Sequence, residues 1–93
     1  MKHERFVELA KERAYNERGA LRPLAAHVRR LYGAIRTLQE DDNSFWYIAD
    51  IIQRARGDQI DPEDFMTRVK TYYHRDRKAL CDVPVTRGSR QLV

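Results

Sequence analysis

The sequence predicts an all-α fold: a compact four-helix domain at residues 1–80, followed by a flexible, extended or disordered tail at residues 81–93. Four segments carry the helical period of apolar residues, and almost nothing alternates with the period of a strand. The 93 residues can fill only one hydrophobic core, so we expect a single domain. The last segment contains Pro84 and Gly88 and has no helical period, which is typical of a tail.

The first helix is expected from about Lys2 to Arg18. Its apolar residues share one face: Phe6, Leu9, Ala10 and Ala14. Gly19 follows, and glycine readily adopts the left-handed conformation of a helix C-cap. Because the segment has no continuous apolar run, we expect part of the mature domain and not a signal peptide.

The second helix is expected to begin near Pro23, since proline suits a first turn, and to end around Gln39. It has the strongest apolar stripe, with residues at alternating spacings of three and four: Leu21, Leu24, Val28, Leu31, Ile35 and Leu38. A stripe of about two and a half heptads is short for a coiled coil. We therefore interpret it as a core face within a bundle or as a homodimer interface.

The third helix is expected at residues 44–56, with apolar residues over more than half its circumference, and should be the central, most buried element. Gly57 ends it. Asp61 and Pro62 then form an N-cap and a first-turn proline for a fourth helix that continues to about Ala79. The apolar stripe of this helix consists of Phe65, Met66, Val69, Tyr72, Tyr73 and Leu80.

The stretch RGDQIDPEDF, residues 56–65, matches the second half of a calcium-binding loop. The first half does not match, because two of its three ligand positions lack a side-chain oxygen. Arg54 and Arg56 would also place positive charge beside the cation. We therefore predict that this stretch caps a helix and binds no calcium.

Nothing in the sequence predicts catalysis, a metal or a cofactor. The histidines lack the paired spacing of metal ligands and are expected to face solvent or cap helices: His3, His27 and His74. The single cysteine, Cys81, lies beside the predicted tail, and no glycine-rich phosphate loop is present. No apolar run approaches the roughly 20 residues of a membrane span. We expect a non-enzymatic protein of the reducing cytoplasm, bound to no membrane.

Charge is segregated along the chain, with a balance of −6 in residues 40–64 and +5 in residues 65–93. The 14 arginines and 4 lysines suit phosphate or acidic partners, or reflect a GC-rich genome. On the second helix, Arg22, Arg29 and Arg36 recur every seven residues and should form a line. The fourth helix should carry a cationic face opposite its apolar stripe: Arg68, Lys70, His74, Arg75, Arg77 and Lys78.

With Arg87 and Arg90 of the predicted tail, these cations would contact nucleic-acid phosphates without reading sequence. The same charge pattern is also consistent with cations that complement the helix dipole and aid solubility, or with an acidic segment that packs against them. Asp76 falls within the apolar arc of the fourth helix, where we expect it to pair with an arginine of the second.

The predicted function is that of a small regulatory or accessory protein that binds nucleic acid. The alternative is a protein-interaction module, either a dimeric adaptor or an inhibitor of a larger complex. Its contacts would come from the apolar stripe of the second helix and from Trp46, Tyr47 and Tyr32, because aromatic residues often anchor such interfaces.

Overall fold

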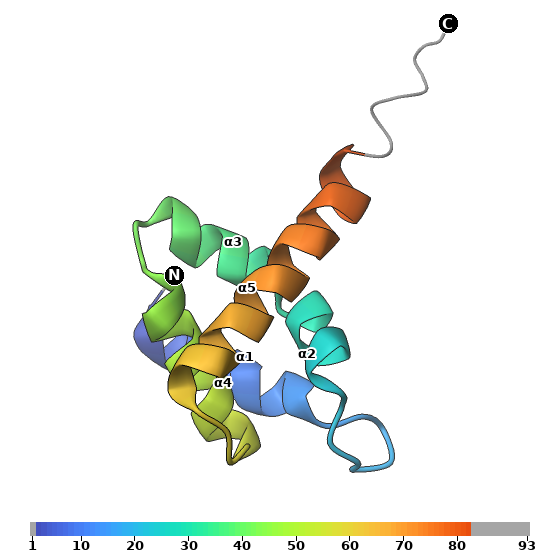
Figure 1. Cartoon of the computed structure of the whole chain (residues 1–93). Helices are drawn as coiled ribbons and strands as arrows, with labels where there is room; N and C mark the ends of the chain where they lie inside the picture. Colours follow the sequence, from blue (N-terminus) through green and yellow to red (C-terminus); the bar gives the residue numbers. More distant parts are fainter. Residues whose placement is uncertain (1, 83–93) are drawn as a thin grey trace, which may run out of the picture.

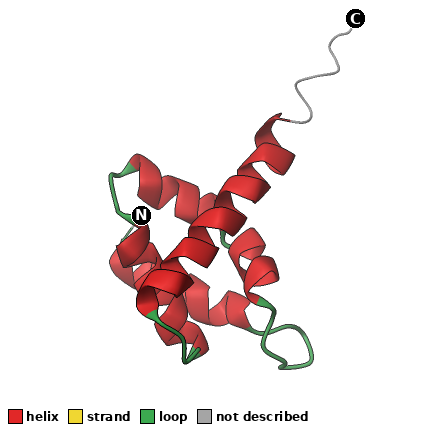
Figure 2. Cartoon of the chain, in the orientation of Figure 1, coloured by secondary structure: helices red, strands yellow, loops and turns green. Residues whose placement is uncertain are grey.

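The computed structural model describes residues 2–82, which form a bundle of helices (Figure 1). In order these are α1 (His3–Ala14), α2 (Leu24–Arg30), α3 (Tyr32–Glu40), α4 (Phe45–Arg56), α5 (Pro62–Arg77) and a π-helical turn, η1 (Lys78–Asp82). Figure 2 shows helices and loops but no strand in this part of the chain. The predicted all-α fold is confirmed, with one α-helix more than expected.

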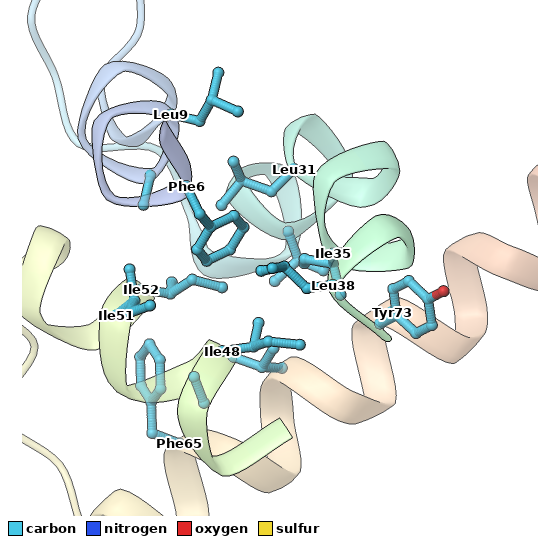
Figure 3. Packing of buried hydrophobic residues seen from close by; sticks show 14 residues of the cluster. Phe6, Leu9, Leu31, Ile35, Leu38, Ile48, Ile51, Ile52, Phe65 and Tyr73 are labelled. Carbon is cyan, nitrogen blue, oxygen red and sulfur yellow. The ribbon is translucent and has the colours of Figure 1, made fainter. Parts of the chain in front are cut away.

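Apolar side chains from all five α-helices form one core. Its large members are Phe6, Leu9, Val28, Leu31, Ile35, Leu38, Ile48, Ile51, Ile52, Phe65, Val69 and Tyr73. Figure 3 shows those of α1, α3, α4 and α5 pointing toward one another. α4 packs against both α1 and α5, so the central helix expected at residues 44–56 is confirmed. Each fully buried side chain of this size contributes about 1.5–3 kcal/mol relative to an exposed one.

The first helix ends at Ala14 and not near Arg18, which corrects the sequence prediction. The cause is Asn16, whose Oδ1 accepts hydrogen bonds from Arg18 N at 2.9 Å and Ala20 N at 3.0 Å. Short polar side chains compete with the helix for backbone groups in this way. Gly19 has φ +81° but does not cap α1; its N–H closes a turn on Asn16 O at 3.0 Å.

The second predicted helix is interrupted at Leu31, which has φ −98° and ψ 4° and separates α2 from α3. Its N–H is shared between the carbonyls of His27 and Val28, at 3.1 and 3.0 Å. The interruption is one residue wide, so most of the apolar stripe still faces the core: Val28, Leu31, Ile35 and Leu38 are at most 1% exposed. Leu21 precedes α2 and is 40% exposed, so it does not belong to the stripe. The interpretation as a core face is confirmed, and the stripe is covered within the molecule.

The predicted start and end of α4 and the predicted start of α5 are confirmed by their capping geometry; α5 ends at Arg77, two residues before the predicted Ala79. Ser44 Oγ accepts a hydrogen bond of 3.2 Å from a backbone N–H in the first turn of α4. Gly57 ends α4 in the left-handed region, with φ 76°. Asp61 Oδ2 accepts hydrogen bonds from Glu63 N at 3.0 Å and Asp64 N at 3.2 Å. Asp61 therefore has the helix-capping role predicted for it.

The last turns of α5 and η1 extend beyond the other helices (Figure 1). Helical backbone continues to Asp82, two residues past the predicted domain end at residue 80. Leu80 was expected on the buried stripe but is 41% exposed, because it lies on this projecting end. The remainder of the predicted tail, residues 83–93, lies outside the described residues.

His27 is fully buried, contrary to the prediction of a solvent-facing or capping histidine. Its Nε2 lies 2.9 Å from Ala10 O, and Arg56 Nη1 lies 3.2 Å from its Nδ1. A carbonyl can only accept and a guanidinium can only donate, so these contacts require a neutral imidazole with its hydrogen on Nε2. Burial lowers the pKa of His27 to about 4, and the charge of Arg56 acts in the same direction. The contacts join α1, α2 and α4.

We predict that the protein loses stability as the pH falls from 6.5 toward 4, because the unfolded imidazole takes up a proton at its ordinary pKa of 6.5 and the folded one does so only near 4. The contribution of His27 is complete above pH 6.5, and up to about 3 kcal/mol is lost below it. Urea unfolding across this range measures the effect.

His27→Gln keeps one donor and one acceptor without a titrating group, so its unfolding free energy should depend less on pH. His3→Gln, at an exposed histidine, should behave like the wild type. Equal pH dependence in the His27→Gln and wild-type proteins would show that His27 is not held neutral.

Candidate nucleic-acid interface

α5 has one buried and one cationic face. Its buried residues follow spacings of four, four and three: Phe65, Val69, Tyr73 and Asp76. All the cations predicted on this helix are exposed: Arg68, Lys70, His74, Arg75, Arg77 and Lys78. The structure therefore brings these predicted site residues together on one surface.

The cations form two edges and an outer row. At 3.6 residues per turn, Arg68 and Arg75 share one edge of α5, and Lys70 and Arg77 share the other. His74 and Lys78 lie between the two edges and form the outer row. From Arg68 to Arg77 the rise along the helix is about 14 Å. We call these residues, together with His74, the α5 cationic surface.

Most of the α5 cationic surface has no acidic partner. Four of its members form no ion pair with another residue of the described range: Arg68, Lys70, Arg77 and Lys78. In the acidic segment 40–64, the three carboxylates with arginine partners pair with α3 or α4. The acids Glu63 and Asp64 lie in the first turn of α5, and no ion pair joins either of them to the α5 cations in residues 2–82. Within the described range, the acidic segment therefore forms no ion pair with this surface.

Aromatic rings support three of the exposed side chains. Lys70 Nζ lies 6.0 Å from the centroid of the Phe45 ring, and the His74 ring lies 5.7 Å from it. Arg75 Cζ lies 5.0 Å from the centroid of the Tyr72 ring. These are distances at which a cation is attracted by a ring face. The sequence pattern placed Phe45 only in the core, because its contact with α5 depends on how the two helices pack.

Asp76 is 1% exposed and lies between Arg29 of α2 and Arg75 of α5. Its Oδ1 is 3.8 Å from Arg29 Nη1 and 3.9 Å from Arg75 Nη2. The predicted pairing with the second helix is therefore confirmed for Arg29. The distances are too long for hydrogen bonds, and Oδ2 is buried with no hydrogen-bond partner in the described part of the chain. The shared carboxylate draws Arg29 next to Arg75 and extends the cationic surface onto α2.

Arg22 and Arg36 were predicted to form a line with Arg29, but they do not extend the cationic surface. Arg22 Nη1 donates to Arg13 O at 2.9 Å and to Tyr15 O at 2.6 Å, so Arg22 holds the carboxyl end of α1. Arg36 lies beyond the interruption at Leu31 and pairs with Glu40 at 3.5 Å. The prediction of one continuous line is wrong, because the helix is broken and Arg22 precedes it.

The three aromatic residues predicted for a protein interface differ in exposure. Trp46 is 52% exposed. Tyr47 is half-buried and its hydroxyl hydrogen-bonds His3 Nδ1. Tyr32 is half-buried, with its ring stacked on Tyr73 at a centroid distance of 5.1 Å. Trp46 thus presents the largest exposed ring of the three.

Arg87 and Arg90, also predicted to contact nucleic acid, lie outside the described residues. Within residues 2–82, no group of three or more His, Cys, Asp or Glu side chains is arranged to hold a metal ion. None of the helices described has the length and apolar character needed to cross a membrane. Comparison with protein-family models, curated proteins and solved structures finds no match.

A double-mutant cycle tests the link between α2 and α5. We predict a coupling of about 0.5 kcal/mol between Arg29→Met and Asp76→Asn in unfolding free energy, because Arg29 is half exposed and solvent weakens the pair. The coupling should fall in about 1 M salt.

Arg30 is the matched control, since it lines a pocket with residues of the α1–α2 loop and not with Asp76. Its cycle with Asp76→Asn should give no coupling. The same coupling at both arginines would rule out a specific pair.

Proposed function

We propose that this protein is a non-catalytic, cytoplasmic regulatory or accessory protein that binds nucleic acid through phosphate contacts made by the α5 cationic surface. The observation that carries the proposal is the exposure of six positive or titratable side chains on α5 and its C-cap Lys78, four of them without an ion-pair partner in residues 2–82. Cations in this state can replace the counterions condensed on a nucleic-acid backbone.

The helix dipole explains only part of this surface. Its effect is confined to the last turn, which contains His74, Arg75 and Arg77 and is followed by Lys78 as the C-cap. Arg68 and Lys70 are in the middle of the 16-residue helix, so the dipole gives no reason for them. Solubility alone does not require that the charges of one sign share a helix either.

The proposed contacts position the backbone and do not read bases. α4 ends at Arg56 and α5 begins at Pro62, so the connection at residues 57–61 has five residues. This is longer than the turn of three or four residues usual in a helix-turn-helix reader. Binding should therefore depend strongly on salt and weakly on sequence.

A second candidate function is capture of a protein partner at Trp46. The exposure of this ring favours it, because tryptophan often anchors protein interfaces. The apolar stripe of α2 and α3, which the same prediction used, is covered by the core. Only the aromatic part of that predicted contact face is therefore accessible.

We predict that the protein binds random-sequence nucleic acid and that Lys70→Gln with Arg77→Gln weakens binding about tenfold or more at about 0.1 M salt. Each lost phosphate contact should also reduce the slope of log affinity against log salt by about one. Fluorescence polarisation with a labelled oligonucleotide, titrated at several salt concentrations, measures both quantities.

Arg5→Gln with Arg54→Gln is the matched control. It removes the same charge from α1 and α4, and both arginines have acidic partners there. This control should retain wild-type binding. Equal weakening by the two double variants, or no binding at about 50 mM salt, would refute the proposal.

A further inference from the structure

Trp46, the only tryptophan of the chain, is the second residue of α4 and is 52% exposed. Tryptophan offers a large apolar surface whose burial is favourable. The Trp46 ring is not needed in the core, and an uncharged ring does not bind phosphate. Its exposure therefore requires another explanation.

The helical repeat puts Trp46 on the edge of α4 that faces α5. Gln53 lies seven residues later and therefore shares that edge. Gln53 Nε2 donates to Asp58 O at 3.1 Å and Ile60 O at 2.9 Å, in the loop that leads to α5. Phe45, which precedes Trp46, has the ring that lies near Lys70 and His74. The helical repeat therefore places Trp46 on the side of α4 nearer to α5.

We propose that the nucleic acid bound by this protein is single-stranded, with an unpaired base stacked on Trp46 and the adjoining phosphates on Lys70 and the outer row of α5. This inference rests on the proposed function. Exposed aromatic rings beside cations are the usual elements of single-strand binding, because every base has a face that stacks. In a duplex the bases are already stacked, so Trp46 would contribute nothing.

The charge distribution gives the strand a direction. Asp42 lies in the turn between α3 and α4, before Trp46 in the chain, and repels phosphate. Figure 1 places that turn and the projecting end of α5 on different sides of the molecule. The strand therefore runs from Trp46 over Lys70 toward Arg77 and Lys78, away from this acid.

Trp46 itself reports the test, because its fluorescence comes from one site. The probes are oligothymidylate, an abasic oligomer with the same number of phosphates, a duplex of matched charge, and oligouridylate to compare RNA with DNA. Oligothymidylate should quench Trp46 and bind about tenfold or more tightly than the abasic oligomer. Oligouridylate should also quench Trp46, and its affinity relative to oligodeoxyuridylate, which differs only in the 2′-hydroxyl, identifies the preferred sugar.

Trp46→Ala should lower the affinity for oligothymidylate about tenfold or more and leave the affinity for the abasic oligomer unchanged. Trp46→Phe should keep most of the affinity for oligothymidylate, because phenylalanine can also stack on a base. Tyr15→Ala is the matched control, because Tyr15 is also exposed, at 46%, but lies in the α1–α2 loop. It should bind like the wild type. Circular dichroism confirms that each variant is folded.

Two results would overturn the inference, and they differ in what they imply for the proposed function. Equal affinity for the abasic oligomer, the duplex and oligothymidylate, with no loss in Trp46→Ala, would mean phosphate binding without stacking. The proposed function would then stand. Failure of all probes to bind at about 50 mM salt would refute both, and would favour a protein partner at Trp46.

Discussion

The arrangement of the helices depends on one buried polar contact, His27 between Ala10 O and Arg56. A polar ring with no exposure is tolerated only when its hydrogen bonds are made, and these two bonds come from α1 and α4. Arg56 Nη1 also donates to Arg22 O at 2.8 Å, which ties the approach to α2 to the end of α4. Small displacements of any of these helices would leave a buried donor or acceptor without its partner.

The same contact explains part of the arginine content. Arg22 and Arg56 donate to backbone carbonyls inside the fold, a use that a planar guanidinium with five donors serves well. Others on α1, α3 and α4 pair with nearby carboxylates, which contributes little stability at an exposed site. Within the α5 cationic surface, Arg75 pairs with the buried Asp76, whereas Arg68 and Arg77 belong to neither group. Much of the arginine-rich composition therefore has structural causes outside α5.

The features predicted from sequence are those that local chemistry determines. Ser44, Gly57 and Asp61 mark helix ends because a cap acts on backbone groups within a few residues of itself. Gly19 misled the prediction because Asn16 closes a turn before it. The interruption at Leu31 has one weak sequence signal, Gly33 within the predicted helix, because glycine disfavours a helix interior; the apolar stripe itself continues across it.

The candidate site also combines features that the sequence predicts with features that only the packing of the helices determines. The exposure of the α5 cations follows from the helical period, and Asp76 could be assigned a partner because a charge in an apolar arc requires one. His27 was missed although it lies between Leu24 and Leu31, within the apolar arc of α2, which was the available signal. The support of Lys70 by Phe45 depends on how two helices pack, which periodicity does not report. α5 carries buried anchors and exposed cations at once, so the packing of the core determines which face of the helix presents the cations to solvent. In the proposed function, this orientation would reduce the conformational entropy lost on binding.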